Sequence, residues 1–344
     1  IGAGHLARCL ALANYLEKLK AKVIFICRNH YGSSHELVLK QKFRLHLLNG
    51  KEDQEISLKH KDWLGFSQLQ DVSESSIFID MYPGSHVIVD HYGLDCQWES
   101  NINCESMTVI DDLADRHHKC SLLIDQSLKN TKLDYENLVD GNFDFMGGNL
   151  VILREEFSDE RAWEALGSGK VLICMGGADP KSYTKKILEN IILNHKRCSS
   201  PQDEIEINVI VGSACTDYDD LKSLAVTDKL KVSILFNPEN ISQLMLQSDL
   251  CILSCGTMIL EACALGVPSI GLTVADNQKN TAEFLARSGA IELYDFSNEK
   301  DRGIYEVVLD FINNPERLSL CSKKLKTMVS SDATEIIARR LCES

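Results

Sequence analysis

The sequence predicts an α/β fold of two Rossmann-like domains that face each other across a cleft. Apolar runs of strand length alternate with amphipathic helical stretches along the whole chain, which is typical of parallel sheets covered by helices. The alternation restarts after a polar stretch at residues 155–170. At 344 residues, the chain is also longer than most single domains. We therefore expect one domain over residues 1–157 and a second over residues 168–344.

The apolar runs also predict the individual strands. In the first domain we expect them at residues 22–27, 44–48, 86–90, 107–110 and 121–125. In the second domain we expect them at residues 171–175, 205–211, 232–235, 249–253 and 269–272. The residues from 301 onward are expected to be mostly helical and to complete the second domain.

The chain begins with a glycine-rich turn, Ile1-Gly2-Ala3-Gly4-His5, that leads into a helix. In a Rossmann-like domain such a turn follows the central first strand. That strand needs about 5–6 residues, and none precede Ile1. We expect residues upstream of Ile1 to supply it.

Composition narrows the class of protein. A formal charge of −14 argues against nucleic acid or an anionic membrane as a partner. The 13 cysteines show no CxxC pair or zinc-type spacing, so we expect reduced thiols in a cytoplasmic protein. No apolar run reaches the length of a membrane span, and no signal peptide precedes the first helix. The oligomeric state stays open, with a monomer as one option.

The segment from Ser254 to Pro268 is the most informative part of the sequence. A buried strand runs into the turn Gly256-Thr257-Met258, which opens a helix, and a Gly-Val-Pro exit leads to the next strand. Unpaired backbone N–H groups at such a helix start attract phosphate. Glu261, about one turn further in, can accept hydrogen bonds from two ribose hydroxyls. The pattern predicts a nucleoside diphosphate site and hence an activated sugar as substrate.

Two other strand ends of the second domain contribute candidates. Gly176-Gly177 lets backbone N–H groups approach a phosphate, and Asp179-Pro180 then starts a helix as cap and first residue. A plain tight turn explains this segment almost as well. Asn277 and Gln278 also follow a strand, and they either reach the substrate or cap the next helix.

In the first domain, the candidates begin with Gly4 and His5. A histidine at a helix start is favoured in its neutral form, which is what a general base near pH 7 requires. The alternative is a histidine that only caps the helix or faces solvent. Arg8, on the next turn, contacts substrate or makes a structural salt bridge. Tyr92 follows a buried strand and is placed to hydrogen-bond a sugar or orient a water.

Acidic residues follow two strands of the first domain. Asp90 and Asp95 flank Tyr92, and a strand-end turn with an Asp cap explains them equally well. The cluster from Asp111 to Arg116 contains Asp-Asp, which more often marks a solvated turn than a divalent cation site. We therefore expect no metal and no cofactor.

Taken in chain order, these segments resemble one family over nearly the whole chain. They are Ile1-Gly2-Ala3-Gly4-His5 with Arg8, the segments 90–95, 111–116, 125–126 and 153–157, then 175–180, Gly256-Thr257, Glu261, 266–268 and Asn277-Gln278. The family is the UDP-2,4-diacetamido-2,4,6-trideoxy-β-L-altropyranose hydrolases of pseudaminic acid biosynthesis, which have the glycosyltransferase-B fold. The chain departs from it in the missing first strand. Its phosphate loop also reads Ser-Cys-Gly-Thr-Met, where the family more often has a second glycine and a serine.

The resemblance implies a metal-independent hydrolysis at the anomeric carbon that releases UDP and the free sugar with inversion. It implies that His5 is the base and that Tyr92 and Asn277 assist. The remaining candidates are expected to bind substrate: Gly4, Arg8, Gly176, Gly177, Gly256, Thr257, Met258, Glu261 and Gln278.

Two alternatives remain. A glycosyltransferase of the same fold would use the same nucleotide site but needs an acceptor surface, and residues 1–150 contain no apolar or basic run that suggests one. A non-catalytic nucleotide-sugar-binding protein would keep Glu261 and the glycine loops but has no use for His5. The combination of His5, Tyr92 and Asn277 favours an enzyme.

Overall fold

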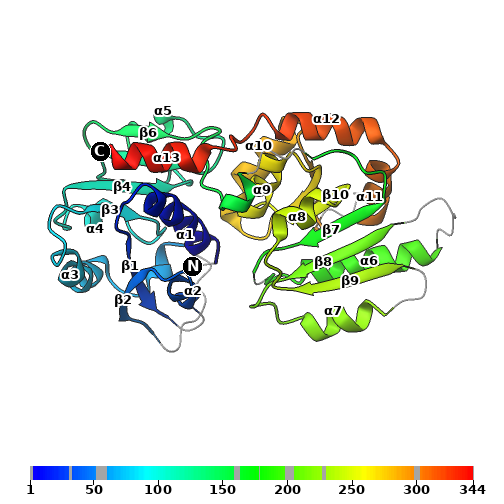
Figure 1. The fold of residues 1–344 in the computed structure, drawn as a ribbon, viewed down its shortest axis with the longest axis horizontal. Helices are drawn as coiled ribbons and strands as arrows, with labels where there is room; N and C mark the ends of the chain where they lie inside the picture. The colour runs from blue at the N-terminus through cyan, green and yellow to red at the C-terminus, as the bar shows by residue number, and fades with distance from the viewer. Residues whose placement is uncertain are drawn as a thin grey trace. The chain divides into compact units, whose positions relative to one another are not determined.

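The chain forms two units, which are described here one at a time (Figure 1). Unit 1 comprises Ile1–Arg154 together with Asp332–Ser344, and unit 2 comprises Glu155–Ser331. The computed structural model describes residues 3–30, 33–51, 60–158, 163–177, 179–197, 205–226, 230–297 and 303–343.

Unit 1 alternates strands and helices as its sequence pattern predicts. Its elements are α1 (Ala3–Lys18), β1 (Ile24–Asn29), α2 (Glu36–Lys40), β2 (Arg44–Asn49), the 3₁₀ turn η1 (His60–Leu64), α3 (Gln68–Ile79), β3 (His86–Val89), α4 (Cys96–Glu99), β4 (Ser106–Asp111), β5 (Leu122–Asp125), α5 (Lys132–Tyr135), β6 (Asp144–Met146) and α13 (Ala333–Cys342). All five predicted strands are present, and the short strand β6 is an addition.

The described strands of unit 1 form two parallel sheets, one of β1 and β2 and one in the order β3-β4-β5-β6. Helix α1 packs on both, since Leu10 and Ala13 contact the β1–β2 side and Leu12 and Leu16 contact Ile110 and Ile124. The apolar side chains of β1 and of most of β3 are half-buried, whereas β5 is buried throughout. The central strand expected before Ile1 stays a prediction.

Helix α13 corrects the predicted domain boundary. The sequence assigned residues 168–344 to the second domain, but α13 packs against α1 of unit 1 (Figure 1). Ile337, Ala338 and Leu341 share a core cluster with Leu12 and Leu16. The apolar stripe of α13 was visible in the sequence, but its partner lies more than 300 positions earlier in the chain.

Unit 2 holds a single parallel sheet in the order β12-β11-β10-β7-β8-β9. Its elements are η2 (Glu155–Phe157), β7 (Lys170–Cys174), α6 (Tyr183–Arg197), β8 (Glu206–Val211), α7 (Tyr218–Leu224), β9 (Lys231–Phe236), α8 (Ile241–Leu246), β10 (Leu250–Ser254), α9 (Thr257–Leu265), β11 (Ser269–Leu272), η3 (Asp276–Gln278), α10 (Lys279–Arg287), β12 (Glu292–Leu293), α11 (Ile304–Ile312) and α12 (Pro315–Leu325). This strand order is that of a doubly wound dinucleotide-binding domain, in which ligands bind where the order reverses, here between β7 and β10.

The polar stretch at residues 155–170, which interrupts the alternation of strands and helices, belongs to unit 2 where it is described. Trp163 is buried, its indole N–H donates to the Ser248 carbonyl at 2.8 Å, and its backbone N–H donates to the Leu265 carbonyl. The Asp249 carboxylate accepts the backbone N–H groups of residues 166–168. Because the stretch is mostly polar, its sequence did not predict these contacts with unit 2.

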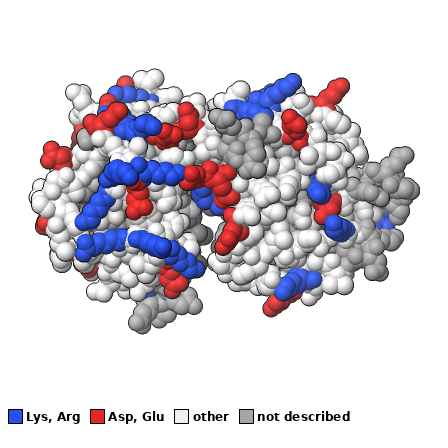
Figure 2. Space-filling view, viewed as in Figure 1, with Lys and Arg blue, Asp and Glu red and all other residues white. Residues whose placement is uncertain are grey.

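Charge is unevenly distributed over unit 1. Figure 2 shows Lys and Arg side chains gathered over α1 and β1 on one face. The exposed residues Lys20, Lys22, Lys40, Lys42 and Arg44 flank the starts of β1 and β2. This face is therefore basic although the net charge of the whole chain is −14. Among the described residues, no helix is both long enough and apolar enough to cross a membrane.

Candidate functional site

The candidate nucleotide site of unit 2 lies at the carboxyl ends of β7 and β10. After β7, Gly176 has a φ of +91°, a conformation that side chains disfavour. After β10, Gly256 is the residue before α9. Since β7 and β10 pair directly, with Cys174 opposite Leu253, both glycine turns lie at the same edge of the sheet. This is the place where the strand order reverses.

Helix α9 opens without a side-chain cap among the described residues. Its first backbone N–H groups have no partner within the helix and attract negative charge. Glu261 lies one turn into α9 and is 4% exposed, and Met258 is also buried. The start of α9 therefore combines a helix N-terminus, which favours negative charge, with the nearby carboxylate of Glu261.

Gln278 lies over the start of α9. Its Oε1 accepts the backbone N–H of Val274 at 2.9 Å, and a Cβ built on Gly256 would be 3.2 Å from its Nε2. The neighbouring Asn277 is half-buried in η3. The structure thus brings Gln278 to the turn of Gly256.

One residue that the sequence pattern did not single out supports the Gly176-Gly177 turn. A Cβ on Gly212, which follows β8, would lie 2.5 Å from the Gly177 Cα, and the backbone N–H of Ala214 donates to the Gly177 carbonyl at 3.1 Å. A glycine directly after a buried strand was the only signal in the sequence. Asp179 holds the other side of the turn, since its carboxylate accepts the N–H groups of Tyr183 and Thr184.

In unit 1, His5 forms a close pair with a buried carboxylate. His5 lies in the first turn of α1, and Asp90 directly follows β3. His5 Nδ1 is 2.6 Å from Asp90 Oδ1, and the two side chains are 13% and 3% exposed. The sequence predicted His5 as a candidate but left Asp90 undecided between a site residue and a turn.

Arg8 joins this pair to a second carboxylate. Its Nε and Nη2 donate to the two oxygens of Asp90 at 2.7 and 2.6 Å, and its Nη1 donates to Asp112 Oδ2 at 3.2 Å. Burial by itself would raise the pKa of Asp90, but Arg8 and His5, which both contact the carboxylate, outweigh it and hold that pKa well below the usual range. Burial likewise opposes the charge on Arg8, and the two carboxylates reverse the effect and raise its pKa.

Tyr92 packs against His5. The two ring centroids are 4.5 Å apart and the rings are nearly perpendicular. The Tyr92 hydroxyl donates to Asp112 Oδ1 at 2.6 Å, and the residue is 2% exposed. Trp63 of η1 lies on Tyr92, with a centroid separation of 5.9 Å.

The two adjacent aspartates at the end of β4, Asp111 and Asp112, both make contacts within unit 1. Asp111 is fully buried, pairs with Arg116 at 2.6 Å and accepts the hydroxyl of Tyr135. Asp112 accepts Arg8 and Tyr92 as described. Among the described residues, no group of three or more His, Cys, Asp or Glu is arranged to hold a metal ion.

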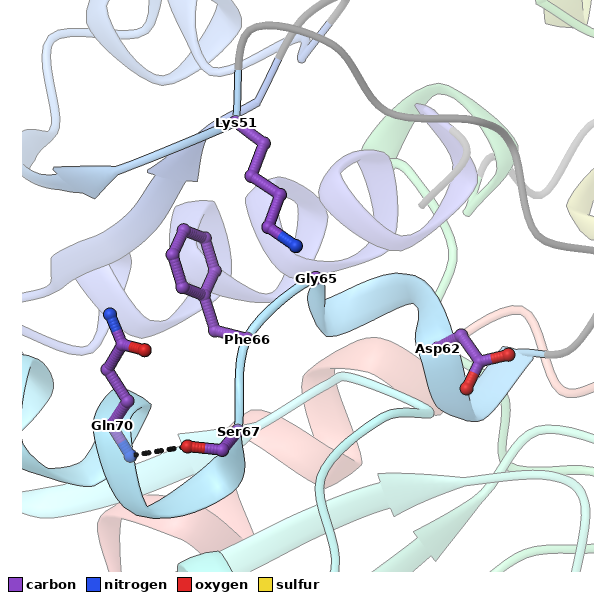
Figure 3. A pocket seen from close by; sticks show the side chains of 6 residues that line it. All are labelled: Lys51, Asp62, Gly65, Phe66, Ser67 and Gln70. Carbon is purple, nitrogen blue, oxygen red and sulfur yellow. Dashed lines mark hydrogen bonds between the residues drawn. The ribbon is translucent and has the colours of Figure 1, made fainter.

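A hollow of about 610 Å³ lies beside η1 in unit 1 (Figure 3). It is lined by Lys51, Asp62, Gly65, Phe66, Ser67 and Gln70. The Arg28 guanidinium lies 4.2 Å from the centre of the Phe66 ring, and the buried pair of Arg28 with Asp71 at 2.6 Å fixes it there. Trp63, which packs on Tyr92, lies in the same segment as Asp62 and Gly65 of the lining.

Comparison with known proteins defines the class of the fold. Residues 171–337 match the model of the glycosyltransferase family 28 C-terminal domain. Over 100% of this chain and 97% of the other, the fold is similar to MurG of Acinetobacter baumannii, with a TM-score of 0.65 at 15% identity. The predicted glycosyltransferase-B fold is therefore confirmed, and residues 171–337 are similar to the C-terminal domain of glycosyltransferase family 28.

Two curated relatives are more similar in sequence. An uncharacterised protein of Methanocaldococcus jannaschii is 28% identical over 293 residues, which cover 79% of this chain and 53% of that protein. The chain thus spans about half the length of this relative. A protein of Campylobacter jejuni is named UDP-2,4-diacetamido-2,4,6-trideoxy-β-L-altropyranose hydrolase. It is 28% identical over 207 residues, which cover 59% of this chain and 71% of that protein.

Proposed function

We propose that the protein hydrolyses UDP-2,4-diacetamido-2,4,6-trideoxy-β-L-altropyranose to UDP and the free sugar, with inversion and without a metal. The observation that carries the proposal is the close pairing of His5 with Asp90 at the start of α1, 2.6 Å apart. A binding protein has no need of such a pair, whereas a hydrolase needs a base for water. The Campylobacter jejuni relative supports this choice of substrate and reaction.

Unit 2 holds the UDP in this proposal. The backbone of Gly176, Gly177 and the first turn of α9 binds the pyrophosphate through N–H groups, and Glu261 accepts the ribose hydroxyls. Gln278 and Asn277 contact the diphosphate or the sugar. The strand-order reversal between β7 and β10 supports this assignment, because ligands of doubly wound sheets bind there.

Unit 1 supplies the base. His5 Nδ1 is engaged by Asp90, so Nε2 is the ring nitrogen left to accept a proton from water. The oxygen of that water forms a bond to the anomeric carbon as the bond from that carbon to the UDP oxygen breaks. The electron pair of the broken bond stays on UDP, a stable leaving group, and the N–H groups of unit 2 stabilise the charge on it. The water proton ends on His5 Nε2.

A glycosyltransferase is the second candidate. The hollow beside η1, at about 610 Å³, has room for an acceptor, and Trp63, next to Asp62 of its lining, packs on Tyr92. In that case His5 would deprotonate an acceptor hydroxyl instead of water. The fold is shared with glycosyltransferases such as MurG, so it does not separate the two reactions.

Release of UDP from the proposed substrate, in EDTA and without an acceptor, tests the proposal. We expect turnover with inversion, loss of turnover in His5→Gln, and unchanged UDP affinity in that variant because the nucleotide is held by unit 2. Tight UDP binding without release would reject the hydrolase and direct attention to acceptors. Loss of activity in EDTA would show that a metal takes part.

A further inference from the structure

The proton between His5 and Asp90 can be located from the geometry. Two bare acceptors repel each other at 2.6 Å, so a proton lies between His5 Nδ1 and Asp90 Oδ1. Arg8 donates to both oxygens of Asp90 and keeps this carboxylate ionised. The proton therefore lies on His5 Nδ1, which leaves Nε2 as the ring nitrogen that can hold a lone pair.

Arg8 has little capacity left for a substrate. Its side chain is 6% exposed, and Nε, Nη1 and Nη2 all donate to carboxylates. Nη2 also lies 3.2 Å from His5 Nδ1, which has no lone pair to accept a hydrogen bond in this tautomer. We therefore infer that Arg8 binds Asp90 and Asp112 and does not contact the substrate.

Asp112 extends the arrangement to Tyr92. One of its oxygens accepts the Tyr92 hydroxyl and the other accepts Arg8. Because Tyr92 packs edge-on against the ring of His5, the five side chains form a closed ring of contacts. His5 is thus held by two contacts, the one from Asp90 to Nδ1 and the one between its ring and the ring of Tyr92.

We propose that Arg8, Asp90 and Asp112 are positioning residues that hold His5 in the Nδ1–H tautomer and orient Nε2 as the base. The proposal rests on the proposed function for the reaction that His5 serves. When Nε2 takes the water proton, the ring becomes a cation, and the Asp90 carboxylate stabilises it. Arg8 keeps Asp90 ionised and in the plane that His5 requires.

The ¹⁵N NMR signals of the His5 ring in the substrate-free protein test the tautomer directly. We expect the Nδ1–H form in the wild type, with the signals assigned by their loss in His5→Gln. Asp90→Asn should shift the population toward Nε2–H, because the amide can donate to Nδ1. His91 serves as an internal control, since its Nδ1 accepts the Gly93 N–H at 2.9 Å and its ring should stay Nε2–H in both proteins.

Kinetics separates positioning from substrate contact. We expect Asp90→Asn to lower kcat by about 10²-fold or more, the range of general base catalysis. Arg8→Lys should lower kcat at least tenfold with KM changed by less than about threefold. Glu335→Gln, which removes an exposed ion pair with Arg339 on α13, should change neither quantity nor the His5 signals. A raised KM with unchanged kcat in Arg8→Lys would place Arg8 on the substrate and overturn its role.

The NMR measurement tests the positioning of His5, and UDP release tests the proposed reaction, so one can fail without the other. An Nε2–H tautomer of His5 in the wild type would overturn the positioning proposal whatever the enzyme turns over. The Nδ1–H tautomer in a wild-type protein that releases no UDP would reject the proposed reaction and support the positioning role. Should Arg8→Lys not fold, Asp90→Asn and the His5 signals still decide the matter.

Discussion

Gly212 and Gly177 pack backbone against backbone, and a Cβ on Gly212 would lie only 2.5 Å from the Gly177 Cα and carbonyl oxygen. The end of β8 thereby supports the glycine turn that follows β7. In the proposed function this turn binds pyrophosphate, so its position depends on a residue that the nucleotide need not touch.

We predict that Gly212→Ala weakens UDP binding and lowers stability by about 1–3 kcal/mol, the cost of overpacking. The added methyl group meets backbone, which cannot move without displacing the Gly176-Gly177 turn. Calorimetric titration with UDP and thermal unfolding measure the two effects. Gly303→Ala is the matched control, because its Cβ would meet nothing closer than Asn190 Oδ1 at 3.8 Å. Equal UDP affinity in the two variants would contradict the prediction.

Glu261→Gln should weaken UDP binding by about 1–3 kcal/mol, the scale of a hydrogen bond to a charged group. Glu261 is buried in α9, and we expect it to accept the ribose hydroxyls. Titration with UDP and with 2′-deoxy-UDP locates the contact. The wild type should prefer UDP, and the variant should lose most of that preference. A variant that discriminates as well as the wild type would move the ribose site elsewhere.

We predict that His91 lowers the free energy of unfolding in acid. Burial lowers its pKa from 6.5 to about 3. Since the folded-state pKa is the lower one, the unfolded chain binds more protons between these values, and stability falls as the pH falls through this window. His91→Asn should keep an acceptor for the Gly93 N–H but remove the titration. Between pH 7.5 and 4.5, we expect the stability of the variant to fall by about 3 kcal/mol less than that of the wild type. Urea unfolding at both pH values measures this, and equal losses would rule His91 out.

Phe66→Ala should raise the KM for the nucleotide sugar several-fold without changing the affinity for UDP. Phe66 lines the hollow beside η1, and its ring is held by Arg28. We expect this wall to contact the sugar or an acceptor, which free UDP does not contain. Leu69→Ala is the control, because Leu69 is 57% exposed and does not line the hollow. The same KM change in both variants would show that the hollow has no specific role.

Much of the fold could be predicted because strands are local features. All ten predicted strands are present within two residues of their predicted ends, since a run such as Leu250–Ser254 is apolar enough to be buried on both faces. The strands that were not predicted, β6 and β12, have only three and two residues and carry little apolar pattern. Helix starts after glycine turns, as at His5 and Gly256, were visible for the same local reason.

The sequence by itself determined the α/β class, the strand positions and the candidate residues at strand ends and helix starts. Only the tertiary structure decided that α13 packs on α1, that Trp163 anchors the polar stretch to unit 2, and that Asp90 contacts both His5 and Arg8 while Asp112 contacts Arg8. These relationships join positions about 80 to more than 300 residues apart. Each partner has an ordinary local explanation, such as a turn, a cap or an apolar stripe. Only folding brings residues that are distant in the sequence into contact, as it brings the carboxylate of Asp90 at a strand end to His5 on α1.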